Sequence, residues 1–284
     1  MRPLIYAHRG SSERFAEHTR AAYLQALADG ADGVECDVHL TGDRQLVLLH
    51  DATLDRTSDG TGPVSEFTLD QLRELDFSSW KGAAVPQAYG GIHDQLLTLA
   101  ELLKILRGAG RGIGLAIEFK HPSAFGQQLE EKALALLRAQ GWLPETSMLA
   151  NIRVSFMSFS RDSLQCLAQS VPTEHLCQLV ADIDADAVRQ EMVLGRLAGG
   201  AVVTMLRGAL AEGEQMIDDG LVGLAGPGIE YLRDHPDRVR RWAARGTRFR
   251  VWTVDTAQDV ELCLRMGVQE LTTNRPSAVR AMLP

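Results

Sequence analysis

Cysteine is scarce in this sequence, and no two cysteines are spaced as C-x-x-C. The four present are Cys36, Cys166, Cys177 and Cys263. At 284 residues the chain is long enough to build a core without disulfide bonds. We therefore expect reduced cysteines and a cytoplasmic protein.

Long apolar runs and an excess of basic charge are also absent. No apolar stretch approaches the roughly 18 residues that would cross a bilayer, and the first residues lack the apolar region of a secretory signal. Lys and Arg number 29 against 37 Asp and Glu, which gives a net charge of −8. We expect no nucleic-acid partner and no stable membrane anchor, and the oligomeric state stays open. Because 45% of the residues are apolar, a disordered chain is excluded.

Short extended segments alternate with helical ones along the chain. The expected strands are Leu4–Ala7, Gly33–Leu40, Leu46–His50, Gly114–Lys120, Val154–Phe159, His175–Val180, Leu221–Ala225, Phe249–Val254 and Glu270–Thr273. The expected helices include Thr19–Ala28, Gln127–Ala139, Ser160–Ala168, Ile229–Ala244 and Thr256–Met266. This alternation predicts parallel strands, in either an open doubly wound sheet or a closed (β/α)₈ barrel.

Two stretches interrupt the alternation. Residues 51–112 contain turn signals and two short helical patterns, near Thr68–Leu75 and Thr98–Leu106, which indicates an insertion on the rim of a single domain spanning residues 1–284. Asp182–Gly220 adds helical material and the apolar run Ala201–Leu206. This run gives more strand candidates than a barrel needs, so the strand count in this half stays open.

The strand Gly33–Leu40 carries an acidic pair. The two-residue period of a strand places Glu35, Asp37 and His39 on one face. Two carboxylates about 4 Å apart repel by about 4 kcal/mol at an effective dielectric of about 20. A divalent cation would reverse that sign, and oxygen ligands suit Mg²⁺ or Ca²⁺. From this segment alone, two acids at a solvated strand end remain the simpler interpretation, and His39 is expected on the rim.

A second strand ends in the same way. Glu118 and Lys120 share a face at the end of an apolar run. Alone they could form an ordinary ion pair. Because ligand-binding groups gather at the carboxyl ends of parallel strands, two such strands together predict that their acids converge.

Two histidines and an arginine also follow strands. His8 and His50 could form an acid/base pair with pKa values near the working pH. Arg9 offers a planar pair of donors suited to phosphate oxygens. Together with the acids, these residues fit phosphoryl transfer, in which positioning and charge neutralisation do most of the work.

The ordered motifs resemble the glycerophosphodiester phosphodiesterase family. They are His8-Arg9-Gly10, Ala16-Glu17-His18-Thr19, Glu35-Cys36-Asp37, His50-Asp51, Leu54-Asp55-Arg56-Thr57 with Gly60 and Gly62, Glu118-Phe119-Lys120 and Trp252-Thr253-Val254. The match extends from His8 to about Pro276. The resemblance implies an α/β fold, a (β/α)₈ TIM barrel with a small insertion after the second strand. It also implies hydrolysis of glycerophosphodiesters to glycerol 3-phosphate and an alcohol in lipid and glycerol metabolism, with one divalent cation, Mg²⁺ or Ca²⁺, and Mn²⁺ as a further candidate.

The same resemblance implies a role for individual residues. Glu35, Asp37 and Glu118 would hold the metal, His8 and His50 would be catalytic, and Arg9 and Lys120 would contact the phosphate. Trp252 would line the substrate cleft, with plain barrel packing as the alternative.

The chain departs from the family pattern at two motifs. Ala16-Glu17-His18-Thr19 stands where the family often has Pro-Glu-Asn-Thr, so we expect altered contacts only behind the site. Asn274 stands where an Asp is common, and no role is assigned to it. The region 182–220 matches the family poorly.

Two other functions are compatible with these residues. A phosphodiesterase directed at lysophospholipids would need an apolar entrance, to which Phe67, Leu69, Leu72 and Phe77 could contribute, although helix core is the simpler use for them. A non-catalytic barrel that binds a phosphorylated ligand would have no need for two histidines.

Overall fold

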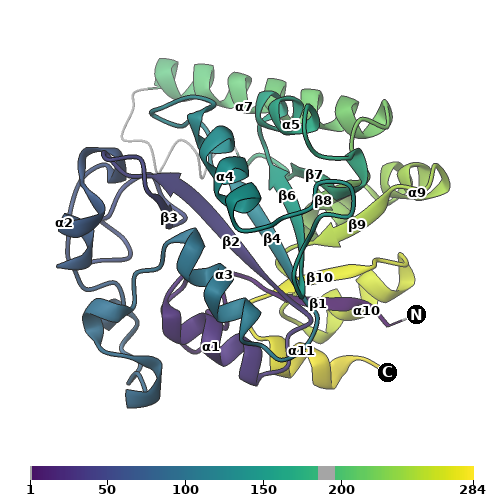
Figure 1. The fold of residues 1–284 in the computed structure, drawn as a ribbon. Coiled ribbons are helices and arrows are strands. Elements are labelled where there is room, and N and C mark those ends of the chain that lie inside the picture. Colours follow the sequence, from purple (N-terminus) through teal and green to yellow (C-terminus); the bar gives the residue numbers. More distant parts are fainter. Residues whose placement is uncertain (1, 185–195) are drawn as a thin grey trace.

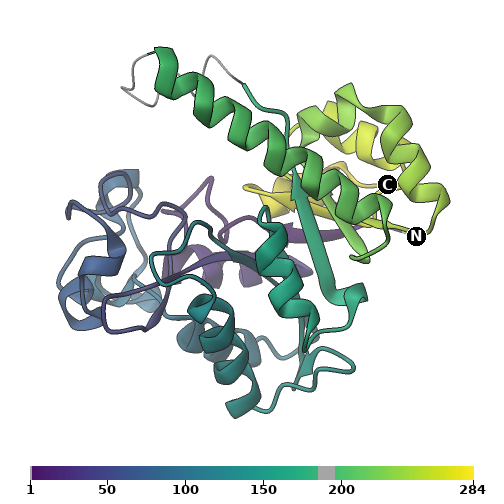
Figure 2. The same cartoon turned by 90° about the horizontal axis from the view of Figure 1, so that it is seen from above.

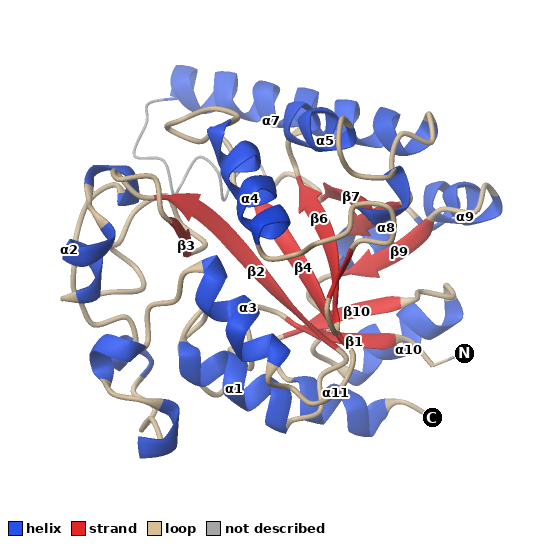
Figure 3. Cartoon of the chain, viewed as in Figure 1, coloured by secondary structure: helices blue, strands red, loops and turns tan. Residues whose placement is uncertain are grey.

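A closed barrel of parallel strands forms the centre of the computed structural model, which describes residues 2–184 and 196–284 (Figure 1, Figure 3). The barrel strands pair in the order β1-β2-β4-β6-β7-β8-β9-β10, and β10 pairs with β1 to close the ring. Their bounds are β1 Leu4–Ala7, β2 Gly33–Leu40, β4 Ile113–Phe119, β6 Ile152–Ser158, β7 Leu176–Val180, β8 Leu224–Pro227, β9 Arg248–Val251 and β10 Glu270–Thr273. The predicted α/β class and (β/α)₈ barrel are confirmed.

Two short strands lie outside the barrel ring. β3 (Leu46–Leu48) pairs antiparallel with β2, and β5 (Met148–Leu149) pairs antiparallel with β6. The apolar run 201–206 belongs to helix α7 (Arg196–Asp218), in which Val203 is buried and Met205 is exposed. With this run in a helix and β3 outside the ring, the surplus of strand candidates disappears. Part of the uncertain region, residues 185–195, lies outside the described residues.

Helices cover the outside of the strands (Figure 2, Figure 3). Their bounds are α1 Arg20–Ala28, α2 Leu69–Arg73, α3 Leu99–Arg107, α4 Gln128–Ala139, α5 Arg161–Ala168, α8 Ile229–Asp234, α9 Pro236–Ala244, α10 Ala257–Arg265 and α11 Pro276–Met282, with single 3₁₀ turns at Val64–Glu66, Ser79–Lys81, Gln87–Tyr89, Ile92–Asp94 and Thr173–His175. The sequence sets several helix starts: the Thr19 hydroxyl accepts a hydrogen bond from the Ala22 amide, and Thr98 with Glu101 forms a capping box. The apolar faces of these helices and of the strands form one large core.

The segment between β3 and α3 has a small core of its own. It consists of Val47, Leu49, Leu54, Val64, Leu72, Phe77 and Leu96, with Phe67 and Leu69 packed against it. This segment lies beside the end of β2, as the α2 region of Figure 1 shows. Leu72 and Phe77 are buried in this small core. Their position favours the core packing expected for them over an apolar substrate entrance.

Strand register brings the acidic residues together. In the parallel pairing of β2 with β4, Asp37 stands opposite Glu118, and both lie toward the carboxyl ends of their strands. Glu35 shares a face with Asp37 because it is two residues earlier.

Across the described residues, we find no helix with the length and apolar character needed to cross a bilayer.

Candidate active site

Three buried carboxylates meet inside the carboxyl end of the barrel. Each of Glu35, Asp37 and Glu118 offers an oxygen, and these oxygens lie within 4.8 Å of one another. The side chains come from β2 and β4, and all three residues are buried. The convergence expected from the two acidic strands is therefore present.

The cluster has the properties of a cation site. Oε1 of Glu35 and Oδ1 of Asp37 are buried and have no hydrogen-bond partner among the described residues. Burial, followed by the neighbouring charge of Asp37, raises the pKa of Glu35 well above its usual value. Buried carboxylate oxygens without donors are costly unless a positive charge meets them. The residues present thus fit a divalent cation with oxygen ligands.

Lys120 supplies one positive charge beside this cluster. Its Nζ lies 2.8 Å from Oε1 of Glu118 and 3.6 Å from Oδ1 of Asp37. Burial raises the pKa of Glu118 to about 7, although Lys120 opposes this shift. Burial would also raise the pKa of Asp37, but the charge of Lys120 and a hydrogen bond from His18 hold it well below its usual value. One lysine therefore offsets only part of the negative charge.

A tight turn after β1 presents Arg9 to the cluster. Arg9 has a left-handed backbone (φ 58°), and Gly10 follows with φ 84°. A Cβ at Gly10 would lie 2.6 Å from the backbone of Ala22, so only glycine fits this turn. The Arg9 amide donates to Oε2 of Glu35, and its Nε lies 3.0 Å from Oδ2 of Asp37.

His8 is oriented by a residue to which the sequence analysis assigned no role. Its Nδ1 lies 2.8 Å from Oδ1 of Asn274, and the Asn274 amide group donates to Asp255. Because the amide nitrogen is used by Asp255, Oδ1 faces His8 as an acceptor. The His8 proton therefore lies on Nδ1, and Nε2 carries the lone pair. Burial and the charge of Arg9 lower the pKa of His8 to about 4, so the ring is neutral near pH 7.

His50 has a different partner. Its Nδ1 lies 2.6 Å from Oδ1 of Asp51, and Arg56 donates to both Asp51 and Glu17. Burial lowers the pKa of His50, and the hydrogen bond to Asp51 opposes the shift. Glu17 in turn accepts a hydrogen bond from Nη1 of Arg9. A chain of charged groups thus links the segment after β3 to the turn after β1.

The negative charge of the cluster acts on the pKa of both imidazoles. Asp37 raises the pKa of His8 and also that of His50, in each case against the effect of burial. His39, expected on the rim, is buried, and its Nε2 donates to the carbonyl oxygen of His50.

His18 contacts the cluster directly. Its Nε2 lies 2.8 Å from Oδ2 of Asp37, and its Nδ1 lies 2.9 Å from the hydroxyl of Tyr23. Its contact with an expected metal ligand fits the altered contacts predicted behind the site. The only sequence signal was the departure from the family motif at residue 18.

Trp252 follows β9 at the same end of the barrel. Its Nε1 donates to the carbonyl oxygen of Gly226, and its ring meets Phe159 edge to face with the centroids 5.7 Å apart. Phe159 follows β6 and is 40% exposed. The pair places an aromatic surface at this end of the barrel. That Trp252 lines the substrate cleft stays a prediction, and the sequence analysis did not identify Phe159.

The fold and this cluster define the class of protein: a (β/α)₈ barrel with a buried carboxylate site, suited to a divalent cation, at the carboxyl ends of its strands. The sequence profile described as "Glycerophosphoryl diester phosphodiesterase family" matches residues 8–278. The chain therefore belongs to the glycerophosphoryl diester phosphodiesterase family, a family of metal-dependent phosphoric diester hydrolases.

Individual relatives agree with this assignment. A probable glycerophosphodiester phosphodiesterase 1 of Mycobacterium tuberculosis is 35% identical, with 99% of this chain and 92% of the relative covered. A glycerophosphodiester phosphodiesterase of Bacillus subtilis is 31% identical over 97% of this chain and 84% of the relative. Among solved structures, an Oleispira antarctica phosphodiesterase in complex with the product sn-glycerol-3-phosphate superposes with a TM-score of 0.72 at 21% identity, covering 99% and 96% of the two chains. That structural likeness confirms the fold.

Proposed function

We propose that this protein hydrolyses glycerophosphodiesters to glycerol 3-phosphate and an alcohol. The observation that carries the proposal is the carboxylate cluster together with two histidines whose Nδ1 atoms have different partners. Nδ1 of His8 contacts a neutral amide oxygen, and Nδ1 of His50 contacts a charged carboxylate. Family membership supports the same substrate class.

Glu35, Asp37 and Glu118 are the residues that would hold the cation. Their oxygens suit Mg²⁺ or Ca²⁺, with Mn²⁺ as a third candidate. When bound, such an ion supplies positive charge that lowers the cost of negative charge on the phosphoryl oxygens. It also relieves the repulsion among three buried acids.

Arg9 and Lys120 bind the phosphate in this proposal. Both cations lie next to the cluster, and Nη2 of Arg9 takes part in no hydrogen bond among the described residues. Their charges stabilise the oxygens of the transferring phosphoryl group as negative charge shifts between them. The contacts of Arg9 to Glu17 and Asp37 hold the guanidinium in place before substrate arrives.

His8 acts as the base and His50 as the acid. Nε2 of His8 carries a lone pair because its other nitrogen faces Asn274, so it can accept a proton from the attacking hydroxyl. The Asp51 carboxylate opposes the lowering of the His50 pKa by burial, so in this mechanism His50 carries the second proton and donates it from Nε2 to the leaving alkoxide. A bond forms between the attacking oxygen and phosphorus, and the bond to the alcohol oxygen breaks. The attacking hydroxyl belongs to water or to the 2-position of the substrate glycerol.

The test is an assay for glycerol 3-phosphate release over a panel of deacylated phospholipids with choline, ethanolamine, glycerol and inositol headgroups. We expect release in Mg²⁺ or Ca²⁺ and none in excess EDTA, with recovery when the cation is returned. Full activity in the chelator would remove the cation from the mechanism. Preferential cleavage of a lysophospholipid would favour that alternative substrate, and tight binding of glycerol 3-phosphate without hydrolysis of any diester would favour a binding protein.

A further inference from the structure

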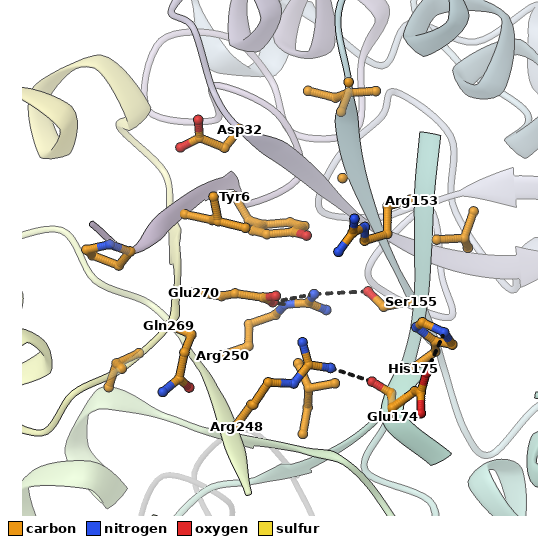
Figure 4. Close-up of a pocket in the computed structure, with 18 of the residues that line it drawn as sticks. Tyr6, Asp32, Arg153, Ser155, Glu174, His175, Arg248, Arg250, Gln269 and Glu270 are labelled. Carbon is orange, nitrogen blue, oxygen red and sulfur yellow. Dashed lines mark hydrogen bonds and ion pairs between the residues drawn. The ribbon is translucent and has the colours of Figure 1, made fainter. Parts of the chain in front are cut away.

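A cavity of about 770 Å³ opens at the end of the barrel opposite the carboxylates. It is lined by residues at the amino ends of the strands, among them Tyr6, Gly114, Arg153 and Arg248 (Figure 4). Gly114 precedes Glu118 by four residues on β4, so the two ends are separated by about 13 Å at about 3.3 Å per residue. This volume is typical of small-molecule sites, which span about 300–1,000 Å³.

Two inward positions at this end of the barrel carry no side chain. A Cβ at Gly33 or Gly114 would lie 2.4 or 2.3 Å from atoms of Tyr6, so the Tyr6 ring lies across the amino ends of β2 and β4. The ring therefore occupies the space that side chains at these two positions would fill, and it forms part of the cavity lining.

The inner wall of the cavity is a buried ion pair that is already satisfied. Arg250 is 1% exposed; its Nε lies 2.7 Å from Oε2 of Glu270 and its Nη2 donates to Ser155. The Arg250 guanidinium also lies over the Tyr6 ring, 4.4 Å from its centroid. The wall is therefore fixed and has little net charge of its own.

The mouth of the cavity, in contrast, has cations that no carboxylate neutralises. Among residues 2–184 and 196–284, the Arg153 side chain has no hydrogen bond or ion pair, and Arg248 donates only to the carbonyl oxygen of Glu174. His175 differs from these two arginines, because its Nε2 has no hydrogen-bond partner but lies 3.6 Å from Oε1 of Glu174. Figure 4 shows the guanidinium groups of Arg153 and Arg248 directed into the cavity, on either side of that of Arg250.

The local charge is opposite to that of the whole chain. Four arginines line the cavity (Arg2, Arg153, Arg248 and Arg250) against three acids (Asp32, Glu174 and Glu270), whereas the chain carries −8. Apolar side chains also line the cavity, and among them Leu4 and Leu264 are exposed. Unpaired guanidinium groups beside an apolar wall favour a ligand with one anionic group and an apolar body.

We propose that this basal cavity binds an amphiphilic organic anion, a carboxylate or phosphate monoester on an aliphatic chain, through Arg153 and Arg248. The anionic group meets the two guanidinium groups, and the aliphatic chain covers the apolar wall. This site is separate from the carboxylate cluster and does not depend on the function proposed for it.

The proposal is tested by calorimetry on the cation-loaded protein with octanoate and octyl phosphate as probes, and with 1-octanol and inorganic phosphate as comparators. We expect saturable binding of at least one of the two anionic amphiphiles, and the tighter one identifies the anionic group that the cavity prefers. Arg153→Leu should weaken that binding about tenfold or more, because a charge-assisted hydrogen bond is lost. Turnover of a glycerophosphodiester should not change.

Arg207→Leu is the matched control, since Arg207 is an exposed arginine on α7 outside the cavity and its loss changes the net charge equally. It should bind the probes as the wild type does. Within the described part of the chain the Arg153 side chain has no hydrogen bond or ion pair to lose, so we expect its replacement to leave the fold intact. The proposal is overturned if neither anion binds saturably, if 1-octanol binds equally well, if Arg153→Leu has wild-type affinity, or if glycerol 3-phosphate displaces the probe.

Discussion

At the scale of single residues, the two imidazoles differ in what their Nδ1 atoms face. Asn274 holds a proton on Nδ1 of His8 without adding charge, whereas Asp51 adds a full negative charge beside His50. We propose that this neutral partner and this charged partner give the two histidines opposite roles, as base and as acid.

This difference predicts how the two histidines respond to the leaving group. Replacing either His8 or His50 with Ala should lower kcat for glycerophosphocholine by about 10²–10⁴. With the p-nitrophenyl ester of glycerol 3-phosphate, whose leaving group needs no proton, His50→Ala should recover most of its activity, but His8→Ala should not. His93→Ala, at an exposed histidine, serves as the control. Equal recovery by both active-site variants would contradict the assignment of acid and base.

Proton competition at the carboxylates gives a second prediction. Burial raises the pKa of Glu118 to about 7 and also raises that of Glu35, and a bound cation requires the ionised form. Each raised pKa means that a proton must leave for the ion to bind, so the apparent affinity for Mg²⁺ should rise with pH, by up to about tenfold per pH unit for each proton released. Calorimetric titrations between pH 5.5 and 8 measure this slope. A flat profile would mean that the three acids are already ionised.

At the scale of elements, the segment after β3 contributes to the site through Arg56. This guanidinium makes hydrogen bonds to both oxygens of Asp51 and both oxygens of Glu17, and so connects the residues behind His50 and Arg9. Arg56 touches neither the cluster nor the proposed substrate position in these contacts, so its effect is one of positioning.

Arg56→Lys should therefore lower kcat about tenfold while the affinity for Mg²⁺ stays unchanged, because lysine keeps the charge but cannot hold two carboxylates in one plane. Steady-state kinetics and calorimetry separate the two effects. Arg73→Lys is the matched control, since Arg73 lies in the same segment and pairs with Glu101 away from the histidines. Wild-type kcat in Arg56→Lys would show that the contacts to Asp51 and Glu17 are dispensable.

At the scale of the whole molecule, β2 and β4 carry three buried acids side by side without enough positive charge to balance them. Lys120 and Arg9 offset part of this charge. A cation that binds only the folded barrel adds about 2.7 kcal/mol to the free energy of unfolding at 100 times its Kd.

We thus expect added Mg²⁺ or Ca²⁺ to raise Tm by about 5–10 °C in a calorimetric scan. Glu35→Gln replaces a carboxylate of the proposed cation site with a neutral amide and removes one repulsive charge. This variant should therefore be as stable as the wild type or more so without the ion, and its Tm should rise little when the ion is added. The same Tm increase in Glu35→Gln as in the wild type would place the bound ion elsewhere.

The sequence alone predicted those features that depend on a single strand or a single helix, such as which side chains share a face and where a helix begins. The period of two puts Glu35 and Asp37 on one face whatever lies around them, and Thr19 and Thr98 mark helix starts by local hydrogen bonds. The ordered motifs predicted the family, and the matched profile confirmed it. The apolar run 201–206 was ambiguous because a short apolar stretch suits a helix as well as a strand.

The remaining features depend on contacts between distant parts of the chain, and only tertiary structure decides those. Closure of the barrel places β10 beside β1, and this brings Asn274 to His8 across 266 residues and fixes the position of the His8 proton. The register of β2 on β4 sets Asp37 against Glu118. The basal cavity likewise depends on where Tyr6 lies over two glycines from other strands. Local patterns determine which side chains share a face, but strand pairing and barrel closure determine which faces meet, because pairing energy is spread over residues far apart in sequence.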